Sequence, residues 1–453
     1  MNTRTQQSAA ILVSLLKEAR HGIRKFENIE ITDTIELKGF DIGSELRFEN
    51  CSFKKIIIQN SVFQESVNFL KTNVEALFFE NIKANKQFNV STDVPPETVH
   101  LKKINFGTAC IVTAAKKTTA IIDCEGPINI NFNPFEEAES VLIAGSQSSD
   151  IRMVSDSFFN AFNEKQMQPV WYKIKRLHFR GSNKAKTYIY RCYIKELIFE
   201  LFTFKETFSI DHVKSDKVVF LDSINTANEK FLINRLSPIT VWDSEIHFVS
   251  SDLGACQIRS CKLCEYSKFI FYNSEFDRVL SRGTIWPTKV CVEEIRRTGA
   301  IRPDFTDESE REELKALYYK SCKTMMANSG ERWQEINFRK LELDQRYSRT
   351  KWKNFLHKLA LGLSKYSSHH GTNWLLSSTL YILLTIAFSL ILMYLNCDSF
   401  KIDAAFQLLN PAHHFESLKI EGGFLVHLVD TLSRVTNSYL IYQTIRGFRN
   451  QVP

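Results

Sequence analysis

The segment from Trp374 to Leu395 constrains this chain more than any other, because it runs for about 22 residues without a charged side chain. As a helix it would be roughly 33 Å long, enough to cross a hydrocarbon core of about 30 Å. The alternative is a wholly buried core helix, which is uncommon at this length. We therefore predict a transmembrane helix, so that the residues before it form a body attached to a membrane.

Length and composition set broad limits. A chain of 453 residues exceeds one ordinary core and should contain at least two domains. Its net charge of +7 suits an anionic membrane surface or an acidic ligand without requiring either. The ten cysteines include one C-x-x-C pair, Cys261 with Cys264, but not the second pair of ligands that a zinc site needs. We predict reduced cysteines in a cytosolic body, with no metal and no cofactor.

Residues 1–25 contain a short apolar stretch. Charged residues follow it at once and no small-residue cleavage site is present, so an export signal is the weaker interpretation. We predict an amphipathic helix that caps the next domain, with one apolar face formed by Ile11, Leu12, Leu15 and Leu16.

From residue 26 to residue 300, short apolar strands recur at intervals near multiples of ten residues. The phrases are LRFENCSF from Leu46, IIIQNSVF from Ile56, LFFENIKA from Leu77, VVFLDSIN from Val218, ITVWDSEI from Ile239 and FIFYNSEF from Phe269. Such spacing is typical of a β-solenoid, in which alternate residues point inward as ladders. A two-sheet sandwich is the alternative, although it seldom keeps one interval over this length. Residues 127–169 fit the pattern worst.

Residues 301–372 change to helical periodicity and form a predicted connector. A first helix carries Leu314, Leu317, Tyr318, Ser321 and Met325, and a second runs from Glu331 to about Tyr347. A third has an apolar face opposite several lysines, as in a helix that lies in the membrane surface, and an ordinary bundle helix is the alternative. The residues of this predicted interfacial face are Trp352, Phe355, Leu356, Leu359 and Leu363.

The predicted membrane domain, residues 373–453, has a second long segment at about 423–446. It combines apolar residues with a polar stripe: His427, Asp430, Thr431, Arg434, Asn437 and Ser438. An Asp or Arg facing lipid at mid-depth would cost about 2.5 to 3.5 kcal/mol. Two spans cannot enclose a water path, so we predict a homo-oligomer, with a tetramer favoured, whose stripes line a central pore. The alternative is a surface helix without a pore.

One segment of the predicted solenoid suits an anionic ligand. Between Glu164 and Glu196 there is no acidic residue, and aromatic residues alternate with cations there. The cations proposed as ligand-binding are Lys173, Lys175, Arg176, Arg180, Lys184, Lys186 and Arg191. Cations beside aromatic faces suit a nucleotide or single-stranded DNA, although half of the aromatic residues should point into the core. A solvated basic strand face is the alternative. No catalytic motif is present, so we predict that the protein is not an enzyme.

Some motifs resemble known families. F-x-N-[CS]-x-F at Phe48 to Phe53 is similar to a degenerate pentapeptide-repeat or right-handed β-helix. Residues 310–450 resemble bacterial two-span, channel-like proteins with pentapeptide-type domains. The carrying features are the helical pair from Leu314 to Tyr347, the basic W-K-N-F-L-H-K, Asn410-Pro411, Ser433-Arg434 and the stretch from Tyr439 to Arg449.

Such proteins resemble membrane effectors of anti-phage defence, such as the channel effectors of the Hailong system, whose family binds a DNA oligomer and is kept closed by it. The resemblance implies an ion channel in a bacterial inner membrane, gated by a solenoid that binds an oligonucleotide. Lysines and arginines flank both predicted spans on one side, which predicts a multi-pass protein with both termini in the cytoplasm. The alternative is a non-conducting, membrane-tethered scaffold that binds a protein or nucleic-acid partner.

Overall fold

The computed structural model describes residues 5–6, 8–17, 23–70, 72–92, 94–108, 110–124, 128–131, 138–144, 150–153, 171–183, 186–227, 230–290, 308–395, 406–413 and 423–451. Lys184, the predicted boundary at residue 300 and most of the link between the two long C-terminal segments lie outside these residues. The chain divides into two compact units, Met1–Asp304 and Phe305–Pro453. Each unit is described by itself.

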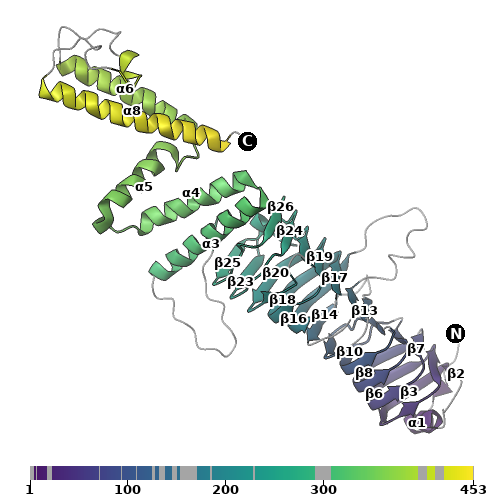
Figure 1. Cartoon of the computed structure of the whole chain (residues 1–453). Coiled ribbons are helices and arrows are strands. Elements are labelled where there is room, and N and C mark those ends of the chain that lie inside the picture. The colour runs from purple at the N-terminus through teal and green to yellow at the C-terminus, as the bar shows by residue number, and fades with distance from the viewer. Residues whose placement is uncertain are drawn as a thin grey trace, which may run out of the picture. The chain divides into compact units, whose positions relative to one another are not determined.

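The first unit is a β-solenoid, as the alternating pattern predicts (Figure 1). Successive turns of the chain place strands alternately in two parallel sheets. Sheet A contains β1 (Thr5–Gln6), β3 (Ile29–Lys38), β4 (Asp41–Ile42), β6 (Ser52–Phe63), β8 (Asn73–Ala84), β10 (Thr98–Phe106), β12 (Thr118–Ile122), β14 (Ala138–Ala144), β16 (Tyr172–Asn183), β18 (Cys192–Phe204), β20 (Lys214–Leu221), β21 (Ile224–Asn225), β23 (Glu245–Val249) and β25 (Lys268–Tyr272). Sheet B contains β2 (Ile23–Glu27), β5 (Glu45–Glu49), β7 (Val67–Leu70), β9 (Phe88–Ser91), β11 (Cys110–Thr113), β13 (Ile128–Asn131), β15 (Asp150–Met153), β17 (Lys186–Tyr190), β19 (Phe208–Asp211), β22 (Phe231–Asn234), β24 (Gln257–Arg259) and β26 (Leu280–Arg282).

The many phenylalanines of the chain form stacks in the solenoid core. Phe179, Phe199, Phe220 and Phe248 are in register on neighbouring strands of sheet A. Their ring centroids lie 5.1, 4.8 and 5.1 Å apart, and the planes are inclined by only 10°, 10° and 3°. Parallel strands about 4.8 Å apart impose this spacing, so each ring covers the face of the next.

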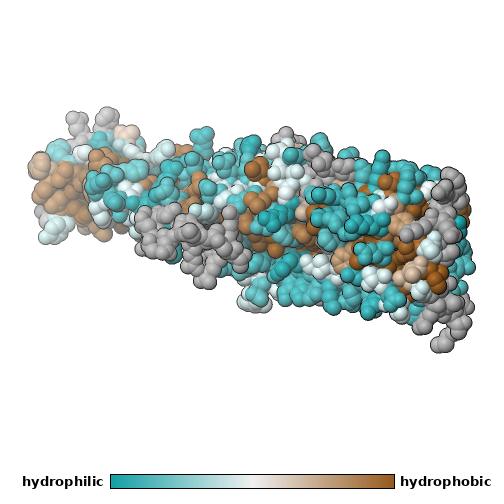
Figure 2. All heavy atoms as spheres, turned by 90° about the horizontal axis from the view of Figure 1, so that it is seen from below, coloured by the Kyte–Doolittle hydropathy of each residue, from teal (hydrophilic) through white to brown (hydrophobic). Residues whose placement is uncertain are grey.

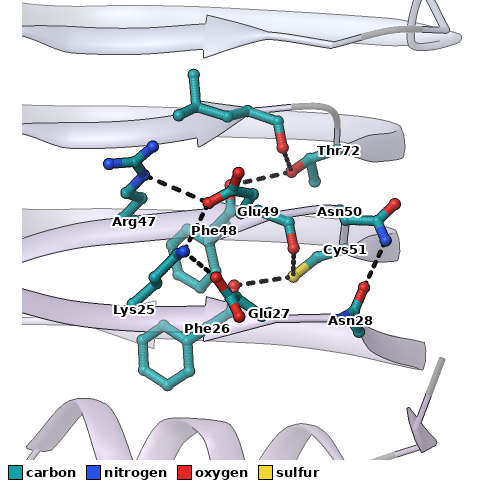
Figure 3. A network of polar contacts seen from close by, with 11 residues as sticks. Lys25, Phe26, Glu27, Asn28, Arg47, Phe48, Glu49, Asn50, Cys51 and Thr72 are labelled. Atoms are coloured by element: carbon teal, nitrogen blue, oxygen red, sulfur yellow. Dashed lines mark hydrogen bonds and ion pairs between the residues drawn. The ribbon is translucent and has the colours of Figure 1, made fainter. Parts of the chain in front are cut away.

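The corners between sheets carry a second set of ladders. Asn28 and Asn50 adopt left-handed backbone conformations, with φ of 54° and 55°, which asparagine tolerates better than most residues. Their side-chain amides hydrogen-bond to each other, and the buried thiol of Cys51 lies 3.4 Å from the carbonyl oxygen of Phe26 (Figure 3). The side chain of Asn81 likewise donates to that of Asn60, 21 residues earlier, at 2.7 Å. The asparagine amides therefore satisfy one another between neighbouring turns, and the thiol meets a backbone carbonyl.

One predicted strand is wrong. Residues 239–243 form an exposed turn, and the strand begins only at the end of the phrase, where Ile246 of β23 pairs with Val218. Both the backbone N–H and the hydroxyl of Thr240 donate to the carboxylate of Asp216, at 2.8 and 2.9 Å, which holds the turn on the surface. Trp242 is 93% exposed there. Alternation alone could not distinguish this turn from a strand.

Helix α1 (Ala9–Lys17) covers one end of the solenoid core. Leu12 and Leu16 are buried and line this end together with Ile35 and Phe48. Ile11, which we expected on the same face, is exposed because the buried face is narrower than the apolar stretch.

The second unit is helical. It contains α3 (Glu308–Ser329), α4 (Arg332–Arg349), the short 3-10 helix η3 (Trp352–Asn354), α5 (Phe355–Ser368), α6 (Trp374–Leu395) and α8 (Phe424–Gln451). Helices α3 and α4 pack on each other through the rings of Tyr318 and Phe338. The buried carboxylate of Glu342 accepts hydrogen bonds from Lys323 at 2.7 Å and from Arg346 at 2.6 Å.

Helices α6 and α8 run side by side in opposite directions. The Ser378 and Thr444 hydroxyls meet at 3.5 Å, and the Thr385 hydroxyl lies 3.4 Å from Asn437 Oδ1. Gly447 permits the closest approach: a Cβ at that position would lie 2.9 Å from the backbone nitrogen of Trp374. Among the described residues one helix, α6, is long and apolar enough to cross a membrane, and α8 does not meet the same test.

Candidate functional site

In the α6–α8 pair the buried side chains are largely polar and the exposed side chains are largely apolar, the reverse of the distribution in soluble proteins. The buried residues of α6 are mostly small and polar, namely Ser377, Thr385 and Ser389 with Leu392. Its large apolar residues face outward, among them Leu375, Ile382, Leu383, Ile386, Leu390 and Ile391. Only 22% of the apolar stretch of α6 is buried, whereas the core helix of a soluble domain is mostly buried. Figure 2 shows hydrophobic residues gathered on the outside of this pair.

Helix α8 shows the same distribution of buried polar and exposed apolar residues. Most of its exposed large residues are apolar: Phe424, Leu425, Leu428, Leu432, Val435, Tyr442, Ile445 and Phe448. Its buried residues include the polar Asp430, Ser433, Asn437 and Gln443. In water this distribution would expose apolar surface and bury polar groups, both of which cost free energy. In a bilayer the outer surface meets lipid, and the inner polar groups join the two helices.

Asp430 is the centre of a buried polar network. One carboxylate oxygen lies 2.8 Å from Nε2 of His413, and the other accepts a hydrogen bond from Arg434 at 2.7 Å. His413 Nδ1 lies 2.7 Å from the carbonyl oxygen of Asn410, which can only accept, so Nδ1 donates to it. The network therefore joins the link between the two long helices to the N-terminal part of α8.

Other polar groups close the interior of the pair. Asn437 donates to the backbone oxygen of Leu408 at 3.0 Å, and the Ser368 hydroxyl donates to Gln443 at 2.9 Å. Leu392, Leu408 and Val426 form a small buried apolar cluster, with Leu395 and Val429 packed against it. Sequence reasoning missed His413, Ser433 and Gln443, although the three-and-four spacing of Asp430, Ser433 and Asn437 is the pattern of a packed helix face.

The structure divides the predicted polar stripe into two faces. Asp430 and Asn437 are buried within the chain, away from its surface, and their lining of a pore stays a prediction. His427, Thr431 and Ser438 are exposed, and the side chain of Arg434 is 31% exposed. Because positions i, i+4, i+7 and i+11 fall on one side of a helix, these four residues form one polar face, which we call the outer stripe. The outer stripe lies beside the face that packs on α6.

The predicted interfacial residues lie on η3 and α5, and all five are exposed: Trp352, Phe355, Leu356, Leu359 and Leu363. The lysines of α5 differ in their surroundings. Lys365 pairs with Asp344 of α4 at 3.0 Å, and Lys358 lies 4.8 Å from the ring centroid of Trp352.

His370 lies at the joint between α5 and α6. It is 2% exposed, and its Nε2 is 3.5 Å from the carboxylate of Asp344, longer than a normal hydrogen bond. Burial is the main cause that lowers the pKa of His370, and the positive charges of Lys365 and Arg446 act in the same direction. Residues 369–371 all have positive φ, and the Asn450 side chain donates to the Gly371 carbonyl at 2.9 Å, so α8 also reaches this joint.

We expect acid to weaken this joint. The folded state favours neutral His370, whereas the unfolded chain takes up a proton near pH 6.5. The contribution of His370 to stability is therefore complete above about pH 6.5 and is lost as the pH falls from there through the lowered pKa of the folded state. Thermal unfolding of the detergent-solubilised protein between about pH 5 and pH 8 measures this slope. His370→Gln should flatten the slope, whereas the same change at the exposed neighbour, His369→Gln, should not.

The predicted basic segment is not an acid-free surface, because neighbouring strands supply acids. Arg176 donates to Glu196 of β18 at 2.6 Å, and Lys175 pairs with Glu139 of β14 at 3.2 Å. Arg180 is in register with Glu200, whose carboxylate lies 3.2 Å from His178. Lys186 is exposed in sheet B, away from these residues. Two of the seven predicted cations, Lys175 and Arg176, are thus paired with acids along sheet A.

A second group of residues gathers at the corner where the chain passes from sheet B to sheet A. The rings of Trp171 and Tyr193 lie 4.6 Å apart, and the Lys214 ammonium is 5.6 Å from each ring centroid. Arg191 lies 5.0 Å from the Tyr190 ring, which is 5.6 Å from the His212 ring. We call Trp171, Tyr190, Arg191, Tyr193, His212 and Lys214 the corner cluster.

The corner cluster only partly matches the predicted site. Lys173, which is exposed, is in register with Tyr193 and belongs beside it. Of the predicted aromatic residues, Phe179 points into the core, whereas Trp171, Tyr190 and Tyr193 are half-buried at the corner. Lys214 and His212 come from the following turn, so only the repeat length could have placed them there. The positive charges and aromatic rings of the corner cluster match the chemistry of a nucleotide or single-stranded nucleic acid.

The cysteines described by the structure are free, and all except Cys264 are buried. Burial raises the pKa of Cys192 to about 12, which leaves its thiol unreactive. In the described part of the chain, no group of three or more His, Cys, Asp or Glu residues could hold a metal ion.

Comparison of the chain with models of protein families, with curated proteins and with solved structures finds no match. The relation to two-span defence effectors therefore depends on the residues quoted above alone.

Proposed function

We propose that this protein is a homo-oligomeric membrane channel whose α6 and α8 cross a bacterial inner membrane as a hairpin, and whose solenoid lies in the cytoplasm and binds an anionic ligand that controls the channel. The observation that carries this proposal is the reversed polarity of the α6–α8 pair, with apolar residues outside and Asp430, Ser433 and Asn437 inside. Such a pair is suited to a bilayer and poorly suited to water.

The outer stripe supports assembly around a polar path. His427, Thr431 and Ser438 remain exposed after α6 has covered the neighbouring face of α8. Inside a bilayer, a face of exposed polar side chains is stabilised by water or by another subunit. A ring of chains that turn their outer stripes to a common axis would supply both. Arg434 would then be the charged group nearest the path, with its charge reduced by Asp430.

The test is ion flux through liposomes that contain the purified chain. With Cys264, Cys291 and Cys397 replaced by serine, Ser438→Cys should make the flux sensitive to a charged, water-soluble thiol reagent, with most of it lost. Val435→Cys lies on the exposed apolar face and is the matched control, which the reagent should leave unchanged. Flux that is absent from inserted wild-type protein both with and without a single-stranded oligonucleotide would exclude a channel.

The alternative function is a non-conducting membrane tether, in which the solenoid recruits a partner. The internal pairing of Asp430 favours this alternative, because within the described outer stripe Arg434 is then the one Asp, Glu, Lys or Arg residue left for a path. Insertion without flux would support this alternative. A role in anti-phage defence rests on the resemblance alone, and its test is whether the gene protects bacteria that carry it from infection.

For the ligand, we propose the corner cluster as the site for a nucleotide or single-stranded DNA. Trp171→Ala should weaken oligonucleotide binding by the full-length protein roughly ten-fold or more, because one aromatic stack contributes about 1–3 kcal/mol per base. Fluorescence anisotropy of a labelled single-stranded oligonucleotide at about 50 and 200 mM salt measures it, and affinity should fall with salt. Arg176→Gln, where Glu196 already holds the guanidinium, is the control with a small effect. Binding that is absent at low salt would remove this part of the proposal.

A further inference from the structure

Helix α5 and the 3-10 helix before it present an apolar surface that the described residues leave uncovered. Leu356 is 78% exposed and Trp352 is 71% exposed, with Phe355, Leu359 and Leu363 on the same side. Large apolar patches of this kind mark an interaction surface. The stripe occupies less than half of the circumference of the helix, so the partner meets one face only.

The charges around the stripe select the kind of partner. Residues 351–368 contain no Asp or Glu. Lys365 is paired with Asp344, and Lys358 lies over the rings of Trp352 and Tyr347, at 4.8 and 5.6 Å. Lys351 and Lys353 flank Trp352 and are exposed. A partner that is apolar within and negatively charged at its surface fits this arrangement.

We infer that α5 lies in the plane of the membrane surface, with its apolar stripe among the acyl chains and with Lys351 and Lys353 bound to the phosphates of anionic phospholipids. The inference rests on the proposed function in one respect, namely that α6 crosses the membrane. Five residues, 369–373, separate α5 from α6. Fully extended they span at most about 18 Å, so the end of α5 must stay close to the bilayer surface. At that depth an exposed apolar stripe with flanking lysines is stable.

Photocrosslinking of the full-length protein tests the inference. The chain carries p-benzoylphenylalanine in place of Leu356 and is placed in nanodiscs of phosphatidylcholine and phosphatidylglycerol in equal amounts. After irradiation, mass spectrometry should find lipid adducts enriched in phosphatidylglycerol. The same group in place of Lys320, an exposed residue of α3, should give none.

The lysines have a separate test in the same experiment. A basic residue near an anionic surface changes lipid preference about five-fold, so Lys351→Gln with Lys353→Gln should remove most of the enrichment. Adducts to a second copy of the chain would overturn the inference, because the stripe would then be a subunit interface. Unchanged enrichment in the double variant would overturn the role of the two lysines. Lipid adducts without ion flux would refute the channel and leave this inference standing.

Discussion

Replacing Phe220 by alanine is expected to lower the free energy of unfolding of the solenoid by about 3–5 kcal/mol, the range for truncating a fully buried phenylalanine. Phe220 is fully buried between Phe199 and Phe248, at centroid distances of 4.8 and 5.1 Å. The cavity would remove both ring contacts at once. Because each turn of a solenoid is stabilised mainly by its neighbours, the loss should spread from β20 to β18 and β23.

Hydrogen exchange of the intact, detergent-solubilised protein measures this effect strand by strand. The amides of β18, β20 and β23 should exchange faster, while those of β6 and β8 keep their rates. Phe78→Ala is the matched control, because Phe78 is a half-buried ring on the outward side of the same sheet. A uniform loss of protection over the solenoid would show a single cooperative unit and contradict the local effect. Equal effects of the two substitutions would contradict the assigned direction of the rings.

The solenoid could be predicted from the sequence because its signal is local. Inward residues such as Ile56 and Leu77 recur at the register of neighbouring strands, and any alternating pattern with this interval satisfies the same packing. The turn at Ile239 could not be predicted, since its surface position depends on Asp216 in the preceding turn. A hydrogen bond between turns leaves no trace in the periodicity of one strand.

The candidate sites were harder to predict because they depend on contacts between separate strands or helices. The composition of residues 164–196 indicates a basic surface, but Glu139, Glu196 and Glu200 lie on adjacent strands and neutralise part of it. The polar residues of α8 were evident, yet which of them pack against α6 depends on the partner helix. Seven-residue spacing separates Asp430 from Asn437, and the same spacing separates Thr431 from Ser438. Only the structure shows that the first pair is buried and the second exposed.

The burial of Asp430 leads to the second prediction with a large expected effect. Asp430→Ala is expected to destabilise the contact between the link and α8 by about 3–5 kcal/mol, because it leaves His413 and Arg434 without the carboxylate that they share. Loss of the contact should make the chain near His413 accessible to protease and should lower the melting temperature of the detergent-solubilised protein. Thr431→Ala is the control. Thr431 is exposed, and its hydroxyl donates only to the backbone oxygen of His427 in its own helix, at 2.8 Å.

A triple variant tests whether the loss of stability in Asp430→Ala comes from the unpaired His413 and Arg434. Asp430→Leu with His413→Phe and Arg434→Met replaces the network by apolar groups, and such replacements are often neutral or stabilising where single deletions are not. We therefore expect the triple variant to recover most of the stability that Asp430→Ala loses. If Asp430 instead faced a pore, Asp430→Ala would change ion preference at unchanged stability, and the triple variant would recover nothing. The Asp430 variants thus distinguish two roles for the polar residues of α8, joining the helices or lining an ion path. Arg434 connects these roles, because it pairs with the buried Asp430 and also belongs to the outer stripe.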